Sequence, residues 1–163
     1  MPRRWFNRPV VERTAQGFVV RLGDQDVALL LRLLQELRGL LQSDDPQVAP
    51  IVRRLFPPAY HLDDEADAEY QRFMREELVT SRLGGMDAVT DALQSGRPLN
   101  DGEITGFMQA LNNVRLVLGT LLDVGEDHDP TEIDDDHPMV SEHQLYNYTS
   151  WLLEMTVQAI SGD

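Results

Sequence analysis

The fold class is decided by residues 99–124, LNDGEITGFMQALNNVRLVLGTLLDV, which combine a well-signalled helix start with the longest apolar period of the chain. Asn100 followed by Glu103 is typical of a capping box. Leu99 and Ile104 stand where a hydrophobic staple would pack. Apolar residues then recur at helical spacing and leave little polar surface, which predicts a mostly buried helix.

One charge interrupts this apolar arc. Arg115 lies in its middle, where an unpaired guanidinium would be costly, so we expect an acidic partner. Glu77 is the expected partner, because it lies on the apolar face of an earlier predicted helix; Glu154 and Asp64 are the alternatives. Removing one member of such a buried pair would cost on the order of 3–5 kcal/mol. A buried arginine held by an acid could instead bind an anionic ligand, which we favour less.

A leucine-rich helix is predicted over residues 24–41, DQDVALLLRLLQELRGLL, with Asp24 as its N-cap. The leucine stripe is wider than one neighbouring helix can cover. It therefore fits either the core of this chain or the seam of a homodimer.

Two more helices follow from the apolar pattern. One begins at Asp63 or Asp64, is expected to weaken or bend at Gly84-Gly85, and resumes over residues 86–93. The other begins near Glu142 and continues to the end of the chain. We expect its aromatic stripe, which includes Trp151, to lie in the core with a polar edge exposed.

Near the N-terminus, Val10-Val11 and Phe18 to Val20 predict two short strands of a β-hairpin. Gly17 between them is available for the positive φ that a hairpin turn requires. Together the patterns predict a mainly α protein, a bundle of about four to five helices with an N-terminal hairpin. The whole chain, 1–163, would be a single domain, with a hairpin arm at 1–22, the bundle at 24–163 and an acidic loop at 125–138. No apolar signal region or spanning run occurs, so we expect a cytoplasmic protein without membrane contact.

The charge of −14 is unevenly distributed. Residues 1–60 carry nine Arg and six acids, whereas residues 116–163 carry eleven acids and no basic residue. This acidic half makes nucleic acid an unlikely partner and favours a basic protein surface. The chain has no cysteine, which excludes a thiol switch, a zinc ribbon and a cysteine nucleophile.

The acidic loop, GEDHDPTEIDDDHP, holds seven acids and two histidines, His128 and His137. Such residues can ligate a divalent ion, but the spacing matches no calcium loop or HExxH motif. No catalytic or nucleotide-binding motif occurs elsewhere. We therefore expect no enzyme, no cofactor, and no catalytic or metal residues. The alternative is a metal- or small-anion-binding protein or enzyme that uses the acid–His loop or Arg115.

Several stretches together resemble one known family: RLFPPAY at 54–60 followed by Asp63-Asp64, ALNNVRLVLG at 110–119, His137-Pro138, and residues 146–154. They are similar to the actinobacterial family that includes the oxidative stress regulator AosR. Asn113 departs from the family's more usual Asp.

The resemblance implies a cytoplasmic regulator that acts through protein partners in transcription, at RNA polymerase through a sigma factor. Redox sensing in that family relies on a pair of cysteines, so direct thiol sensing is not carried over to this chain. The residues that we expect to have structural or interaction roles are Arg115, Glu77, Asn112, Asn113, Tyr60, Trp151 and Glu154.

Overall fold

The computed structural model describes residues 8–43, 45–48, 55, 64–122 and 140–162. A hairpin, β1 (Val11–Thr14) and β2 (Gly17–Val20), comes first. Four long helices follow over the described residues: α1 (Asp24–Gln42), α3 (Asp64–Ser95), α4 (Asp101–Leu122) and α5 (Val140–Ser161). The predicted fold class, mainly α with a short N-terminal hairpin, is confirmed.

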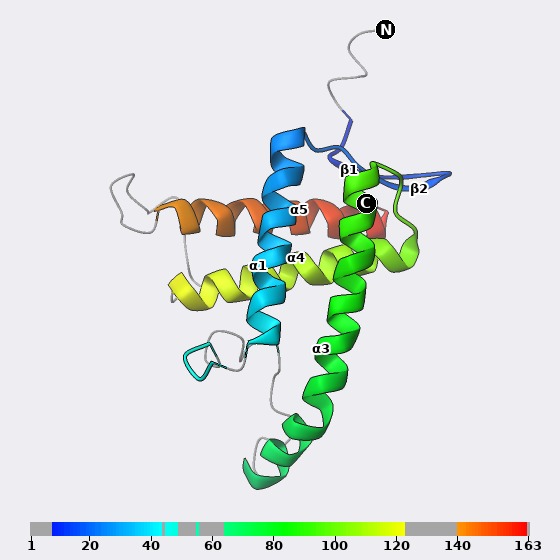
Figure 1. The fold of residues 1–163 in the computed structure, drawn as a ribbon. Coiled ribbons are helices and arrows are strands. Elements are labelled where there is room, and N and C mark those ends of the chain that lie inside the picture. Colours follow the sequence, from blue (N-terminus) through cyan, green and yellow to red (C-terminus); the bar gives the residue numbers. More distant parts are fainter. Residues whose placement is uncertain (1–7, 44, 49–54, 56–63, 123–139, 163) are drawn as a thin grey trace, which may run out of the picture.

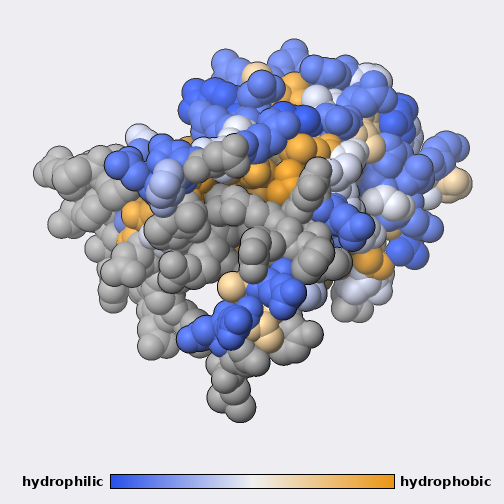
Figure 2. Space-filling model, turned by 60° about the horizontal axis from the view of Figure 1, so that its bottom comes forward, coloured by the Kyte–Doolittle hydropathy of each residue, from blue (hydrophilic) through white to orange (hydrophobic). Residues whose placement is uncertain are grey.

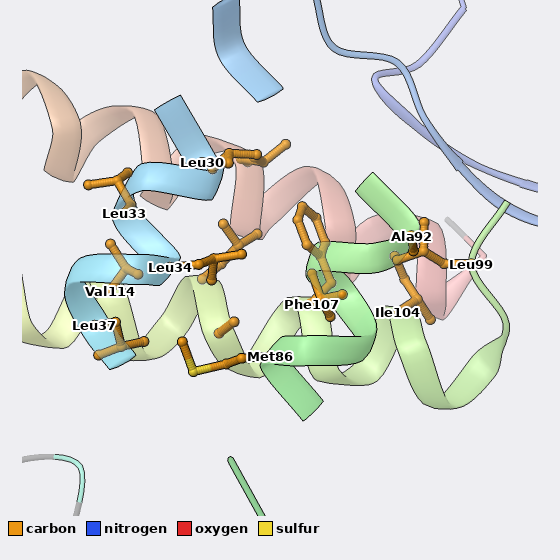
Figure 3. Close-up of a cluster of buried hydrophobic side chains, with 14 of the residues drawn as sticks. Leu30, Leu33, Leu34, Leu37, Met86, Ala92, Leu99, Ile104, Phe107 and Val114 are labelled. Atoms are coloured by element: carbon orange, nitrogen blue, oxygen red, sulfur yellow. The ribbon is translucent and has the colours of Figure 1, made fainter. Parts of the chain in front are cut away.

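The helices form two layers. α4 and α5 run antiparallel and side by side, and α1 and α3 cross over this pair at steep angles (Figure 1). α1 and α3 contact each other and α4, while the hairpin contacts α4 and α5. The core lies where the layers meet, and Figure 3 shows the α1 leucines, Met86 of α3 and Phe107 of α4 converging there.

The start of α4 is formed as its sequence predicts. The Glu103 N–H donates to Asn100 Oδ1 at 2.8 Å, and the Asn100 N–H donates to Glu103 Oε1 at 3.1 Å, which completes the capping box. Leu99 and Ile104 are both buried. Along α4 an apolar face is buried from Ile104 to Gly119, although Leu121 near its end is 45% exposed.

The leucine stripe of α1 lies in the core of this chain. Its buried members face both α3 and α4, so two neighbouring helices cover a face too wide for one; they are Leu30, Leu33, Leu34, Leu37 and Leu41. The predicted N-cap is wrong by one residue. Gly23 takes that position without a side-chain cap, and Asp24 lies in the first turn, where its charge favours the helix dipole.

The restart expected after Gly84-Gly85 is wrong, because α3 is continuous from Asp64 to Ser95. A Cβ on Gly106 of α4 would lie 3.8 Å from the Gly85 carbonyl oxygen and 3.6 Å from a methyl group of Val89. The two backbones therefore come close at this crossing. Packing here outweighs the roughly 1 kcal/mol that each helical glycine costs.

The hairpin pairs Val11 with Val20 and Thr14 with Gly17, and Gly17 has the positive φ, +126°, that the sequence predicts. Its inward side chains, Val11 and Phe18, are buried. Phe18 also forms a β-bridge with Leu99, the residue just before α4. The hairpin is thus fastened to the helical layers.

The buried face of α5 differs from the one predicted. Trp151, expected in the core, is 41% exposed, whereas Thr149, Leu152 and Thr156 are fully buried. The two threonine hydroxyls donate to the carbonyls of Leu145 and Leu152, four residues earlier, so their burial leaves no donor unpaired. None of the helices in the described part of the chain is both long and apolar enough to cross a membrane.

Candidate functional site

Arg115 lies on α4 and is half-buried. Its Nη2 donates to Asn112 Oδ1, one turn earlier, at 3.0 Å. Its Nε is buried and has no acceptor among the described residues. The guanidinium is therefore held by an amide of its own helix.

The predicted pair with Glu77 is not formed. Glu77 is exposed on α3, and the ion pairs among the described residues do not include it or Arg115. The helix crossing explains this. Glu77 lies eight residues before Gly85 and Arg115 lies nine after Gly106, about 12 and 14 Å from the crossing along helices that diverge steeply. Sequence periodicity places residues on a face but does not give the crossing angle.

The other predicted acids are exposed too. Asp64 is the first residue of α3, and Glu154 lies on the outer face of α5 near Trp151. Asn113 is half-buried on α4. Those predicted site residues that the structure describes therefore do not converge on one pocket.

Tyr148 and Trp151 form a tilted ring pair on α5, with centroids 6.1 Å apart. Burial raises the pKa of Tyr148 to about 12, and the nearby Asp26 carboxylate adds to this rise. The phenol oxygen is buried without a hydrogen-bond partner in the described part of the chain. The surroundings of Tyr148 therefore favour the neutral form of its phenol.

Two predicted features, Tyr60 and the acid–His loop at 125–138, lie outside the described residues. Within residues 8–43, 45–48, 55, 64–122 and 140–162, no group of three His, Asp or Glu side chains is arranged to hold a metal. The structure therefore leaves the metal alternative to experiment.

The sequence gives no signal for a groove that lies between the hairpin, the start of α1 and the end of α3. This hairpin groove has a volume of about 480 Å³. Its lining residues are Val20, Leu22, Asp24, Val27, Ala28, Leu31, Ala92, Leu93, Gln94, Ser95, Gly96, Arg97 and Leu99. Most are apolar, and they come from three separate parts of the chain.

Arg97 at the rim of this groove is held by two carboxylates. Its Nη1 and Nη2 reach Glu103 Oε1 and Oε2 at 2.9 and 2.5 Å, and Nη2 lies 3.5 Å from Asp91. The hydrogen bond from Arg97 is the main reason that the pKa of Glu103 is lowered, and the Asn100 N–H contributes. The capping box predicts Glu103, but nothing local marks Arg97 as its partner.

A smaller apolar hollow of about 90 Å³ lies between α1 and α4. Its lining residues are Leu33, Glu36, Leu37, Leu40, Val114, Val117, Leu118 and Leu121. Figure 2, in which the bottom of Figure 1 comes forward, shows apolar surface exposed among hydrophilic residues. Apolar surface is thus available outside the core.

The family model that matches this chain is described as "Domain of unknown function (DUF2017)" and spans residues 6–160. The chain belongs to this family. The chain is also similar to the oxidative stress regulator AosR of Mycobacterium tuberculosis and of Mycobacterium bovis. Each is 24% identical over 196 aligned residues, covering 98% of this chain and 88% of the relative. No solved structure matches. The family resemblance predicted from the sequence is confirmed.

Proposed function

We propose that this protein is a non-enzymatic regulator in the response to oxidative stress and that it acts by binding a protein partner. The observation that carries the proposal is its similarity to AosR over 98% of this chain and 88% of the relative. A similarity of that extent runs along nearly all of this chain and most of the relative, and is not confined to one short segment. That relative is named as a regulator and not as an enzyme.

The charge distribution supports a basic partner surface. Residues 116–163 carry eleven acids and no basic residue, and the whole chain carries −14. A net negative charge of this size repels nucleic acid and speeds encounter with basic proteins. We propose that the partner is a sigma factor or RNA polymerase and that the two proteins meet in the cytoplasm. The choice of this partner and of this compartment rests on the family resemblance.

The absence of cysteine defines how such a regulator can respond. No thiol–disulfide step can occur within this chain. We therefore expect that treating this chain alone with a thiol oxidant leaves its binding to the partner unchanged. Any oxidant response would come through the partner or through the amount of this protein.

A deletion strain in the native organism tests the proposal. Deletion should change survival in hydrogen peroxide, and the full-length chain should restore it. Affinity capture with the tagged full-length chain at mild salt should recover an RNA polymerase subunit or a sigma factor. The yield should be the same whether or not the tagged chain is first treated with a thiol oxidant. Wild-type survival in the deletion strain, or capture of the protein alone, would refute the proposed function.

A second candidate function, small-anion binding at Arg115, is favoured by one observation, the buried Nε without an acceptor among the described residues. Phosphate and sulfate are the probes. An anion present at a hundred times its dissociation constant should add about 2.7 kcal/mol to the free energy of unfolding. The effect should vanish in Arg115→Met. A matching titration with Zn²⁺ or Mn²⁺ tests the acid–His loop.

A further inference from the structure

The outer edge of β2 has an unusual hydrogen-bonding position at Val20. Along a strand of an antiparallel pair, the backbone N–H and C=O groups of one residue bond to the partner strand, and those of the next residue point away from it. The Arg21 N–H donates to the Val10 carbonyl at 2.7 Å, so Arg21 faces β1. Phe18 faces the opposite side, where it exchanges two 2.8 Å hydrogen bonds with Leu99. Val20, two residues from Phe18, therefore points its N–H and C=O away from β1.

No backbone group of the described residues pairs with Val20 on this side. Continuing the antiparallel bridge from Leu99 would place Arg97 opposite Val20. The residues before Leu99 do not continue this pairing with β2, because α3 ends at Ser95 and Gly96 turns with a φ of +71°. The bridge at Leu99 is thus one residue long, and the hairpin groove opens directly beyond it.

We propose that the hairpin groove binds an extended peptide segment of a protein partner, which adds to β2 at Val20 as a further strand. The segment has apolar side chains at alternate positions and lysine or arginine between them. The proposal rests on the proposed function only in taking the peptide from a protein partner. Strand addition of this kind draws affinity from main-chain hydrogen bonds and specificity from alternate side chains.

The groove floor fits the apolar half of that pattern. Alternate side chains of an added strand point to one face, and the half-buried Val27 and Leu31 of α1 and Leu93 of α3 line the groove that these side chains would enter. A volume of about 480 Å³ is in the range that holds a drug-sized ligand, and therefore several side chains of a peptide. The floor is already shaped, so little ordering is needed.

The charges at the groove fit a cationic segment. Arg97 is held by Glu103 and Asp91, whereas Asp24 has no ion pair among the described residues. The last turn of α3 has no basic residue, so its carbonyl end is uncompensated. The N-terminus of α1 also borders the groove, but the positive end of its helix dipole is compensated by Asp24 and Asp26 in the first turn. A second copy of this chain is disfavoured, because it would bring another Asp24 and another charge of −14.

The test uses an acetylated seven-residue peptide of alternating lysine and valine, titrated into the full-length protein while backbone amide resonances are followed. Val20, Leu22 and Leu99 should shift most. Val20→Pro should weaken binding at least tenfold, because it removes the outward N–H and places a ring on that edge while sparing the β1 ladder. The matched control, Val20→Thr, keeps the N–H and should bind within about threefold of wild type.

Two further measurements do not depend on how well Val20→Pro folds. A peptide of alternating glutamate and valine should bind at least tenfold more weakly, and so should the lysine peptide with N-methyl groups on alternate amides. Asp24→Asn should weaken the lysine peptide severalfold. Shifts that map elsewhere, equal binding by a folded Val20→Pro, or no shift at millimolar peptide would each overturn the inference.

Other occupants have their own signatures. If the wild type is a dimer by light scattering and Val20→Pro is a monomer, a second copy occupies the edge. If a chain lacking residues 1–7 binds the peptide tenfold more tightly, its own N-terminus is the occupant. Either result overturns the proposal of a partner peptide. Peptide binding at Val20 without a peroxide phenotype on deletion would refute the proposed function alone.

Discussion

The hydroxyl of Tyr148 is the clearest example of a single group whose removal should help the fold. It is buried without a hydrogen-bond partner among the described residues, and burial raises its pKa to about 12. The unfolded phenol titrates near 10. Because the folded pKa is the higher one, ionisation of Tyr148 does not reduce the free energy of unfolding below about pH 10, but it does so progressively as the pH rises towards 12.

Tyr148→Phe should therefore raise the free energy of unfolding at pH 7 by about 1 kcal/mol, since a buried unpaired hydroxyl costs on that order. The variant should also lose less stability than wild type between about pH 10 and 12. Urea unfolding at several pH values measures both. A lower stability of the variant at pH 7 would show that the hydroxyl has a partner after all.

Arg115 and Asn112 allow a test of the contact that replaces the predicted ion pair. Asn112→Ala should destabilise the protein by about 1–3 kcal/mol, because it takes away the acceptor of a half-buried guanidinium. The cost should be smaller in an Arg115→Met background, where no charge is left unpaired.

Glu77→Gln is the matched control for this contact, because Glu77 is exposed. It should change the free energy of unfolding by less than about 0.5 kcal/mol. A cost of several kcal/mol for Glu77→Gln would restore the ion pair that the sequence suggests. Urea unfolding of the four variants, including the double mutant, decides between the two partners.

At the scale of elements, the carboxylate of Glu103 fastens the start of α4 to the end of α3. It accepts hydrogen bonds from Arg97 and from the Asn100 N–H, which together lower its pKa. A lowered folded pKa means that the contribution to stability is present above the unfolded value of about 4.3 and is lost as the pH falls through the folded one.

Glu103→Gln should lower the free energy of unfolding at neutral pH by about 1 kcal/mol, the upper range for an exposed ion pair with good geometry. The difference from wild type should vanish in acid, where protonated Glu103 resembles glutamine. Thermal melts from pH 7 to pH 2 measure it. Glu154→Gln, on the exposed face of α5, should show no such pH dependence; if it does, the effect is one of net charge.

Local signals explain which elements the sequence could predict. The capping box at Asn100, the positive φ of Gly17 and the apolar periods of α1 and α4 depend on residues within a few positions of each other. The error at Gly84-Gly85 has the opposite origin. There the close contact with Gly106 of α4 overrides a local preference, and no single-sequence pattern shows that contact.

At the scale of the molecule, the angle between the two helix layers is what sequence reasoning lacked. It separates Glu77 from Arg115. The packing of β2 against the ends of α1 and α3, which forms the hairpin groove, is likewise absent from any local pattern. The same lack explains Trp151, since the buried side of α5 carries Thr149, Leu152 and Thr156 and not its largest apolar residue. The apolar faces of most helices could be predicted, but not which of these faces pack against each other.

The hairpin was predicted as an arm, yet its packing implies that it unfolds together with the helices. Phe18 is 2% exposed and bridges to Leu99, which is itself buried beside the start of α4. Phe18→Ala should therefore destabilise the helical transition by about 3–5 kcal/mol, the usual cost of emptying a buried phenylalanine site. Far-ultraviolet circular dichroism during urea unfolding reports the helices, and amide exchange reports the hairpin. Val19→Ala, on the opposite and only half-buried side, should cost much less. A helical transition unchanged by Phe18→Ala, with faster exchange in the hairpin alone, would make residues 1–22 a separate arm and would leave the β2 edge without the rigid support that strand addition needs.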